Sequence, residues 1–260
     1  MTVPRIHFPG FVEQGRFCEL GGKDLRYVRS VLRMKTGDRL ILFDGAGCEC
    51  EAVIKAVSSD GVKVEVLRKN MLDDRGIRIT VFQALPKGNK MDAIVRKATE
   101  LGASVIIPFI SARSVPRLTQ EKARDRVSRW RSIAKEAARQ GGRADIPEVR
   151  EILSFDEMLA SAEGPELKII FWEEESERGI KELLRGGRNK RAKDVSVIIG
   201  PEGGFSNEEV ARAVAAGFTS VSLGRYVLKV ETAAVTILSI IQYELGIFGG
   251  ERQGEGGSGG

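Results

Sequence analysis

From residue 77 to residue 246, short apolar runs alternate with longer segments in which apolar residues recur every three or four positions. Continuous apolar runs are typical of strands buried on both faces, and the three-to-four spacing is typical of amphipathic helices. Their alternation indicates an α/β fold with a mostly parallel sheet. The pattern predicts strands at 77–84, 104–109, 148–151, 167–172, 195–199 and 219–223, and helices at 89–102, 119–140, 154–162, 177–185, 207–216 and 231–246.

The first 72 residues show a different pattern, in which strand-like alternation is broken by tight turns. Val62, Val64 and Val66 alternate with polar residues, and the pairs Asp44-Gly45 and Asp60-Gly61 are typical of turns between antiparallel strands. This pattern predicts a small barrel-like β domain.

One helix is predicted inside this β domain, within residues 23–38. Its apolar residues follow helical spacing, and its arginines fall on the opposite side. One face can therefore pack while the other can meet phosphate. The apolar residues are Leu25, Val28, Val31 and Leu32, and the arginines are Arg26, Arg29 and Arg33.

A polar stretch at residues 70–76 separates the two patterns, so we place a domain boundary there. The expected organisation is a β domain over residues 1–72, an α/β domain over 73–248 and a flexible glycine-rich tail over 249–260. Several residues mark helix ends: Asn89 as a cap, Ser206 with Glu209 as a capping box, and Gly102, Gly217 and Gly246 as helix terminators.

The net charge of +5 is distributed unevenly along the chain. Lys and Arg minus Asp and Glu gives +4 for residues 1–40, −1 for 41–84, +8 for 85–150 and −6 for 151–260. A dense group of cations attracts polyanions. Nucleic acid is therefore the favoured partner, with an ordinary solvated surface as the alternative.

Other features exclude several classes of protein. No run approaches the roughly 18 apolar residues of a membrane-spanning helix, and the first residues lack the apolar core of a signal peptide. We therefore expect a cytoplasmic protein. Cys18, Cys48 and Cys50 are expected to be free thiols, and with His7 as the single histidine no metal site is expected.

Three unusual loops follow predicted strands in the last third of the chain: FWEEE (171–175), GPEGGFS (200–206) and LGRYVLKVETAA (223–234). Ligands of open α/β sheets bind beyond the carboxyl ends of the strands, so one shared pocket is expected. The loop GPEGG matches neither the dinucleotide-binding nor the Walker pattern. Taken alone, it could be a tight turn before a capped helix.

Longer motifs in the same order carry a family resemblance over about residues 3–246. They include PRIHF, VLRMKTGDRLILFDG, KGNKMDAIVRKATELGASVIIPF, RWRSIAKEAARQGGRADIPEV, IIGPEGGFS and LGRYVLKVETA. In these motifs the chain resembles the RsmE family of ribosomal RNA uridine-N3 methyltransferases, in the SPOUT class of S-adenosylmethionine-dependent enzymes.

The resemblance implies a PUA-like β-barrel that helps hold RNA, followed by a SPOUT domain with a C-terminal trefoil knot. It also implies a homodimer with active sites near the interface. The methyl donor, S-adenosylmethionine, would bind in the knot loops. The matching donor residues are Phe171, Trp172, Glu173, Ile199, Gly200, Pro201, Glu202, Gly203, Gly204, Leu223, Gly224, Val227, Leu228, Thr232 and Ala233.

The chemistry of this donor suits the loops. S-adenosylmethionine has no phosphate, its adenine favours apolar walls, and its sulfonium is a cation. Glu202 is tolerable near that cation, or it could be a charge that favours a helix N-terminus. Both roles stay open.

The implied reaction methylates N3 of a uridine in 16S RNA of the small ribosomal subunit. Lys229, Arg225 and Arg139 could stabilise negative charge on the uracil oxygens. Glu231 could accept a proton, although positioning of a cation is favoured. His7 is expected to contact RNA or to pack near the N-terminus rather than to act as the base.

The RNA face is expected, from family position and charge, at Arg5, Arg26, Arg29, Arg33, Lys87, Lys90, Arg139, Gln140 and Arg143. The chain departs from the family where Tyr226 and Lys229 replace the usual arginines, and Lys cannot reproduce the bidentate grip of Arg. Trp130 is expected in the core or at a dimer interface. Two alternatives remain: another SPOUT activity on tRNA or on ribose 2′-O, and a non-catalytic RNA-binding module.

Overall fold

A computed structural model of the chain describes residues 3–10, 13–71, 76–114 and 119–246. Its contacts divide the chain into two compact units. The first unit is Met1–Arg75 with Arg131–Pro147, and the second is Gly76–Trp130 with Glu148–Gly260. The expected tail at 249–260 lies outside the described residues.

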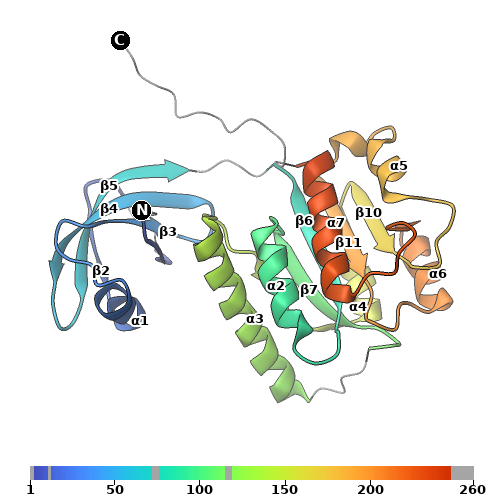
Figure 1. Cartoon of the computed structure of the whole chain (residues 1–260), viewed down its shortest axis with the longest axis horizontal. Helices are drawn as coiled ribbons and strands as arrows, with labels where there is room; N and C mark the ends of the chain where they lie inside the picture. Colours follow the sequence, from blue (N-terminus) through green and yellow to red (C-terminus); the bar gives the residue numbers. More distant parts are fainter. Residues whose placement is uncertain (1–2, 11–12, 72–75, 115–118, 247–260) are drawn as a thin grey trace, which may run out of the picture. The chain divides into compact units, whose positions relative to one another are not determined.

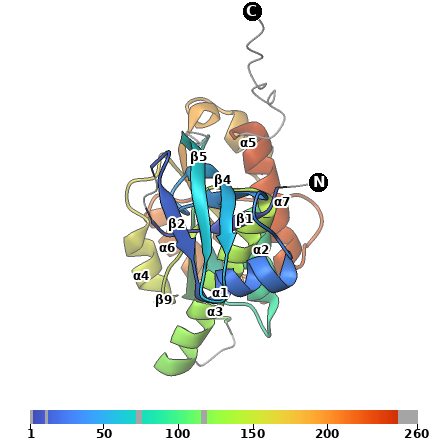
Figure 2. The same ribbon diagram turned by 90° about the vertical axis from the view of Figure 1, so that its left-hand side faces the viewer.

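The first unit is built on a five-stranded sheet in the order β1-β3-β4-β5-β2 (Figure 2). Neighbouring strands are antiparallel except β1 and β3, which are parallel. The strands are β1 (Arg5–His7), β2 (Phe17–Leu20), β3 (Arg39–Phe43), β4 (Cys48–Val57) and β5 (Val62–Met71). The pattern of residues 1–72 therefore predicted the antiparallel strands but not the short β1.

The predicted helix of this unit is α1 (Gly22–Arg26), followed by a π-helical turn, η1 (Tyr27–Val31). Leu25 and Val28 are buried in the core as expected. Val31 is 66% exposed, so the prediction was wrong for this residue. The wider π turn breaks the 3.6-residue period that placed Val31 on the buried face.

Residues 131–147 join the first unit although they are distant from it in sequence. The Ile146 N–H donates to the carbonyl of Gly45 at 2.9 Å, and the Gly47 N–H donates to that of Ala144 at 3.3 Å. The Arg5 guanidinium donates to the Arg143 carbonyl at 3.1 Å. This excursion of the chain was not predicted.

The second unit contains a parallel sheet in the order β12-β10-β11-β6-β7-β8, with β9 also paired to β7 (Figure 1). The strands are β6 (Arg78–Ala84), β7 (Val105–Ile110), β8 (Glu148–Val149), β9 (Leu153–Ser154), β10 (Leu167–Phe171), β11 (Asp194–Ile199) and β12 (Thr219–Val221). The helical segments are α2 (Lys90–Glu100), α4 (Phe155–Ser161), α5 (Ile180–Arg185), η2 (Asn189–Arg191), α6 (Asn207–Ala215) and α7 (Val230–Glu244), together with the first half of α3 (Gln120–Gly141), whose second half belongs to the first unit.

Both faces of this sheet are buried, which explains the continuous apolar runs in the sequence. Alternate residues such as Phe82, Ile170 and Ile198 share a core with residues of α4 and α6. Helices α2 and α7 lie side by side on the other face (Figure 1). The α/β fold with a mostly parallel sheet is therefore confirmed.

The helix-end signals have mixed outcomes. Ser206 and Glu209 form the expected capping box of α6. Gly102 and Gly217 have φ values of +86° and +89°, as helix terminators often do. Asn89 occupies the N-cap position of α2, but its side chain makes no capping hydrogen bond, so that part of the prediction was wrong.

Strand pairing alone does not define how the chain threads through its loops, so the trefoil knot stays a prediction. None of the helices formed by the described residues combines the length and the apolar character that crossing a membrane requires.

Candidate functional site

The second unit contains a cavity of about 440 Å³ at the carboxyl ends of its central strands. It lies where the loops after β10, β11 and β12 meet the first turns of α7. The lining residues are Lys90, Phe171, Trp172, Glu173, Ile199, Gly200, Pro201, Glu202, Gly204, Ser222, Leu223, Gly224, Arg225, Tyr226, Val227, Leu228, Lys229, Val230, Glu231, Ala233 and Ile237.

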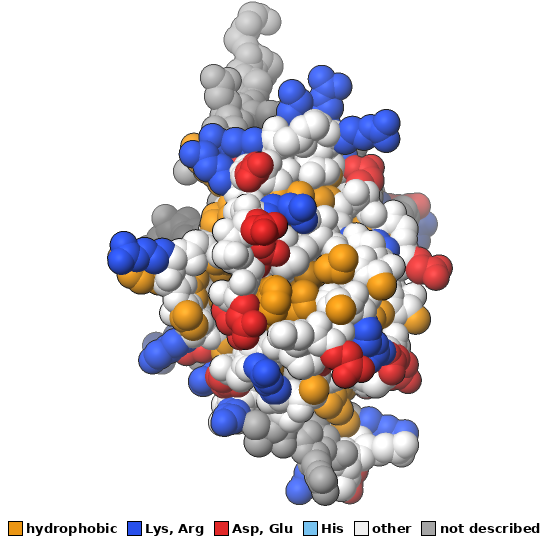
Figure 3. Space-filling model, turned by 90° about the vertical axis from the view of Figure 1, so that its right-hand side faces the viewer, with side chains coloured by type: hydrophobic (Ala, Val, Ile, Leu, Met, Phe, Trp, Pro, Cys, Tyr) orange, Lys and Arg blue, Asp and Glu red, His pale blue; other side chains and the backbone are white. Residues whose placement is uncertain are grey.

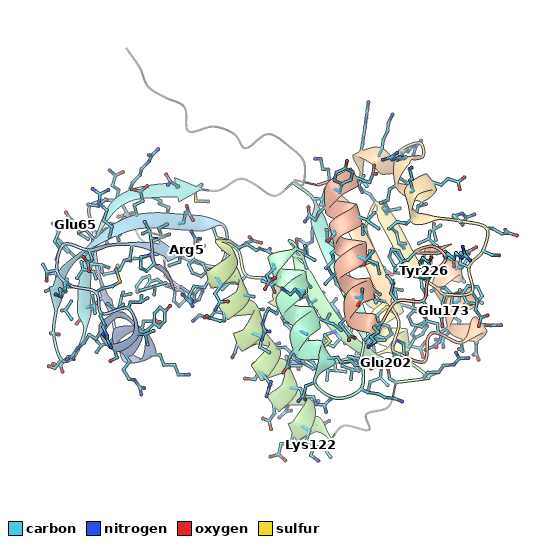
Figure 4. The ribbon with its side chains drawn as sticks, viewed as in Figure 1. Arg5, Glu65, Lys122, Glu173, Glu202 and Tyr226 are labelled. Atoms are coloured by element: carbon cyan, nitrogen blue, oxygen red, sulfur yellow. The ribbon has the colours of Figure 1, made fainter. Side chains whose placement is uncertain are left out.

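The structure therefore brings the three predicted loops together around one cavity. All the predicted donor residues line it except Gly203 and Thr232, which directly adjoin lining residues. The cavity also includes Ser222, Val230 and Ile237, which sequence reasoning did not select. Figure 4 shows Glu173, Glu202 and Tyr226 in loops on the same side of the second unit.

Backbone hydrogen bonds fix the first and third loops to each other. The Trp172 N–H donates to the carbonyl of Val221 at 3.1 Å, just where β10 and β12 end. The Ser222 N–H donates to the Arg178 carbonyl at 2.9 Å, and the Gly224 N–H donates to Ser222 Oγ at 3.0 Å. These bonds hold the loop after β10 beside the loop after β12.

The glycine loop depends on the absence of side chains. Gly204 has a φ of +67°, a conformation that disfavours other residues. A Cβ atom at Gly204 would also collide with the carboxylate of Glu173. An alanine at position 204 would therefore require the flexible end of the Glu173 side chain to move away from the glycine loop.

Two hydrogen bonds from residues distant in sequence hold the glycine loop, residues 200–204. The Arg113 guanidinium donates to the Gly203 carbonyl at 2.8 Å, and Gln83 Nε2 donates to the Gly200 carbonyl at 3.4 Å. Neither residue was predicted for the site. Arg113 follows β7 by three residues, so its only sequence signal was its place after a strand.

Glu202 is bound to the start of α2. Its carboxylate accepts hydrogen bonds from the Lys87 backbone N–H at 3.1 Å and from Lys90 Nζ at 2.8 Å. Burial alone would raise the pKa of Glu202, but the hydrogen bonds from Lys90 and Lys87 outweigh it and lower this pKa. Glu202 therefore already has a cationic partner, Lys90. Its carboxylate lies at the N-terminus of α2 and not at that of α6, the helix that follows it in the sequence.

Lys90 was predicted to contact RNA, but it lines the cavity. The hydrogen bond to Glu202 raises the pKa of Lys90, and the charge of Glu231 raises it further. Lys90, Glu202 and Glu231 therefore form one charged group at the edge of the cavity.

Three of the four predicted catalytic residues, Arg225, Lys229 and Glu231, line the cavity. Glu231 Oε2 is buried and has no hydrogen-bond partner among the described residues, and the same holds for Trp172 Nε1. Both atoms retain hydrogen-bonding capacity that the described part of the protein does not use.

The face of the second unit drawn in Figure 3 shows hydrophobic side chains gathered beside acidic ones.

Arg139, the fourth predicted catalytic residue, belongs to the first unit. Its guanidinium donates to the Tyr27 hydroxyl at 2.7 Å and to Glu136 Oε2 at 2.9 Å, and it lies 4.8 Å from the centre of the Tyr27 ring. The hydrogen bond with Glu136 raises the pKa of Arg139. This side chain is therefore well anchored within its own unit.

The remaining residues of the predicted RNA face fall into two groups. Arg5 is internal to the first unit, where it pairs with Glu49 at 2.8 Å and keeps a side chain only 11% exposed. Arg143 pairs with Asp145 and is 14% exposed. The other group consists of exposed residues, of which Arg29 bonds with the Ser58 carbonyl and Gln140 with Glu136: Arg26, Arg29, Arg33, Lys87 and Gln140.

His7 packs inside the first unit. Its ring meets Phe43 edge to face at 5.4 Å, and Nε2 lies 3.2 Å from the Asp44 carbonyl. Burial, followed by the charge of Lys135, lowers the pKa of His7. Of the two roles expected for His7, this geometry favours packing.

Two domain families match the chain. Residues 20–67 match the family described as RNA methyltransferase PUA domain, and residues 73–242 match the family described as RNA methyltransferase domain.

Curated relatives match along nearly the full length. Ribosomal RNA small subunit methyltransferase E of Bacillus subtilis is 33% identical over 93% of this chain and 95% of the relative. The protein of the same name from Mycobacterium tuberculosis is 30% identical over 88% of this chain and 87% of the relative.

Two solved structures with a bound ligand are similar. A methyltransferase from Legionella pneumophila, in complex with the bound cofactor SAM, is 34% identical with a TM-score of 0.84, over 93% of this chain and 98% of that chain. Ribosomal RNA small subunit methyltransferase E from Neisseria gonorrhoeae, bound to S-adenosyl methionine, is 28% identical with a TM-score of 0.82, over 93% and 97%. The chain thus belongs to the ribosomal RNA small subunit methyltransferase E family.

Proposed function

We propose that this chain methylates N3 of a uridine in 16S RNA of the small ribosomal subunit, with S-adenosylmethionine as the methyl donor. The observation that carries the proposal is the cavity at the carboxyl ends of β10 and β11, where three loops distant in sequence meet. Membership of the methyltransferase E family supports the same reaction.

The residues of the cavity fit this donor. Phe171, Ile199 and Leu223 supply apolar surface for an adenine ring, and the glycines leave backbone groups accessible. Glu231 keeps an unused carboxylate oxygen for a cationic ligand. The lining contains three cations, Lys90, Arg225 and Lys229, of which Lys90 is already paired with Glu202.

S-adenosylmethionine, when bound, supplies an electrophilic methyl group on its sulfonium. The task of the protein is to place uridine N3 in line with that methyl group. Loss of the N3 proton to solvent water places negative charge on N3 and the uracil oxygens, and this charge is neutralised as the new N–C bond forms and the methyl–sulfur bond breaks. We assign Arg225 and Lys229, which line the cavity, to stabilise this charge.

We assign Glu231 a positioning role. Its negative charge acts on Lys90, which in turn holds Glu202. Arg139, through its anchored guanidinium, is retained as a candidate for RNA contact in the first unit. The exposed cations Arg26, Arg29 and Arg33 complete the proposed RNA surface of the first unit, and exposed Lys87 is proposed to contact RNA from the second unit. Since ribosomal RNA is its proposed substrate, we place the protein in the cytoplasm.

We also propose a homodimer that uses α7. This helix buries Val230, Ile237 and Ile241 on one side, yet exposes 66% of Tyr243 on another. The family resemblance implies the homodimer, and the uncovered Tyr243 makes this side of α7 the candidate interface. Sedimentation equilibrium of the purified protein should give twice the chain mass, and a monomer at all concentrations would refute the dimer.

Calorimetry with S-adenosylhomocysteine tests the donor site directly. We expect saturable binding at one site per chain, and no binding would refute the enzymatic proposal. Mass spectrometry of ribosomal RNA from cells with and without the gene tests the substrate. We expect loss of one N3-methyluridine from 16S RNA, whereas loss of a tRNA or 2′-O-methyl signal would show a different activity.

A further inference from the structure

The rim of the cavity exposes an unusual amount of apolar surface. Tyr226 is 77% exposed and Val227 is 86% exposed, although both line the cavity. These are the two largest exposed fractions among the large hydrophobic side chains of the described residues. Figure 4 shows Tyr226 at the outer side of the second unit, in the loop between β12 and α7.

The loop that carries Tyr226 is fixed at both ends. Gly224 has a φ of +116° and is bound to Ser222 Oγ at 3.0 Å, while Val230 begins α7 and is buried. The tip between these anchors therefore presents its side chains outward. Because the Tyr226 ring is exposed, packing in the protein core does not explain an aromatic residue at this position.

A cation accompanies the ring. The Arg225 guanidinium carbon lies 6.0 Å from the centre of the Tyr226 ring. An aromatic ring beside an arginine is the combination with which proteins hold unpaired bases, because the ring stacks on the base and the cation meets the phosphate.

We propose that Tyr226 stacks on a nucleobase of the RNA at the mouth of the cavity and so positions the target uridine. The inference rests on the proposed function, since the base must enter the cavity past this rim. Tyr226 acts here as a positioning residue for the RNA, at the exposed rim of the cavity that it lines.

Substitutions at position 226 test the stacking. In the full-length protein, Tyr226→Ala should lower kcat/KM for an unmodified 16S RNA transcript by about tenfold to a hundredfold, through a higher KM. Tyr226→Phe and Tyr226→Trp should stay within about threefold of the starting protein, because both keep a ring that can stack. Val214→Ala, which trims an exposed apolar side chain of α6, is the matched control and should change nothing.

Donor binding separates this proposal from the proposed function. In Tyr226→Ala the affinity for S-adenosylhomocysteine should fall by no more than about threefold, much less than kcat/KM for RNA, because the ring lies at the exposed rim of the cavity that it lines. If the unaltered protein binds no donor, the proposed function fails, whatever the variants do.

Three results would overturn the stacking role itself. The first is a loss of donor affinity in Tyr226→Ala that matches its loss of activity. The second is a Tyr226→Phe variant as impaired as Tyr226→Ala, which would assign the effect to the hydroxyl. The third is a monomeric Tyr226→Ala protein, which would show that the ring contacts a second copy of the chain.

Discussion

Gly204 and Gly217 both have left-handed backbone conformations, and comparing them tests the role of Gly204 beside the Glu173 carboxylate. Gly204→Ala would place a Cβ atom against the Glu173 carboxylate and would force a left-handed conformation on alanine. Gly217→Ala creates the same backbone strain at φ +89°, but no atom lies within 4 Å of the added Cβ. Both substitutions strain the backbone, but only Gly204 lines the cavity and only its added Cβ would meet the Glu173 carboxylate.

We expect both variants to lose about 1–2 kcal/mol of unfolding free energy from the strain. Only Gly204→Ala should also weaken S-adenosylhomocysteine binding, by about tenfold or more. Calorimetry on the two proteins checks this. Equal affinities in both variants would show that the fit between Gly204 and Glu173 does not matter for the donor.

The titration of His7 should affect the stability of the first unit. Its pKa is lowered by burial, so the folded protein favours the neutral ring. This contribution is present above the ordinary value of 6.5 and is lost as pH falls through the lowered folded pKa. Melting temperature should therefore fall between pH 7.5 and pH 5.5, and it should fall less in His7→Gln, which cannot take up a proton.

A glutamine at position 7 can still pair with the Asp44 carbonyl, so the comparison isolates the charge. Thermal unfolding followed by circular dichroism provides the measurement. Identical slopes for the two proteins over this pH range would contradict the assignment to His7.

At the scale of residues, the sequence located the cavity because strand order alone brings the three loops to one edge. It did not place Lys90 at the cavity, because the local sequence around a lysine at the start of a helix is the same whether the side chain binds RNA or Glu202. Arg113 was missed for a similar reason. Its bond to Gly203 spans 90 positions, and no local pattern records a contact of that range.

At the scale of elements, two capping boxes of the same composition have different surroundings. Glu209 of α6 accepts hydrogen bonds from Ser206 and, through its other oxygen, from the Ala112 N–H at 2.8 Å, and it is only 5% exposed. Glu157 of α4 accepts bonds from Ser154 alone and is exposed. The α6 box therefore joins its helix to the loop after β7.

Glu209→Ala should destabilise the protein by about 2–3 kcal/mol, because it removes a charged acceptor and strands the Ala112 N–H. Glu157→Ala should destabilise the protein clearly less, because its carboxylate is exposed and bonds only with Ser154 among the described residues. Urea denaturation of both variants provides the comparison. Equal losses would show that the bond to Ala112 contributes little.

Sequence periodicity predicted the elements of the second unit well because its strands and helices pack on two faces of one sheet. It failed where backbone geometry departs from the standard periods. The π turn at Tyr27–Val31 shifts Val31 to the surface, and the two-residue strand β9 is too short to show any alternation. The Ser154 capping box was also missed, although its Ser and Glu have the expected spacing.

For the whole molecule, the uneven charge predicts two different responses to salt. RNA affinity should fall on the order of a hundredfold between 50 and 200 mM salt, because cations release counterions from the phosphates. Donor affinity should change less than about twofold, since the donor has no phosphate. Filter binding and calorimetry over the same salt series check both.

The triple variant Arg26→Ala, Arg29→Ala, Arg33→Ala should reduce the slope of log affinity against log salt by about 2. Glu13→Ala, which changes an exposed acidic residue of the same unit, is the control of opposite charge. An unchanged slope in the triple variant would remove these arginines from the RNA surface.

The return of residues 131–147 to the first unit has a consequence for synthesis on the ribosome. When the first 75 residues have emerged, Arg143 and Ile146, which bond with Arg5 and Gly45, have not yet been translated. At about 5–20 residues per second, the missing piece follows several seconds later. The N-terminal unit can therefore complete its folding only after residues 131–147 have been translated.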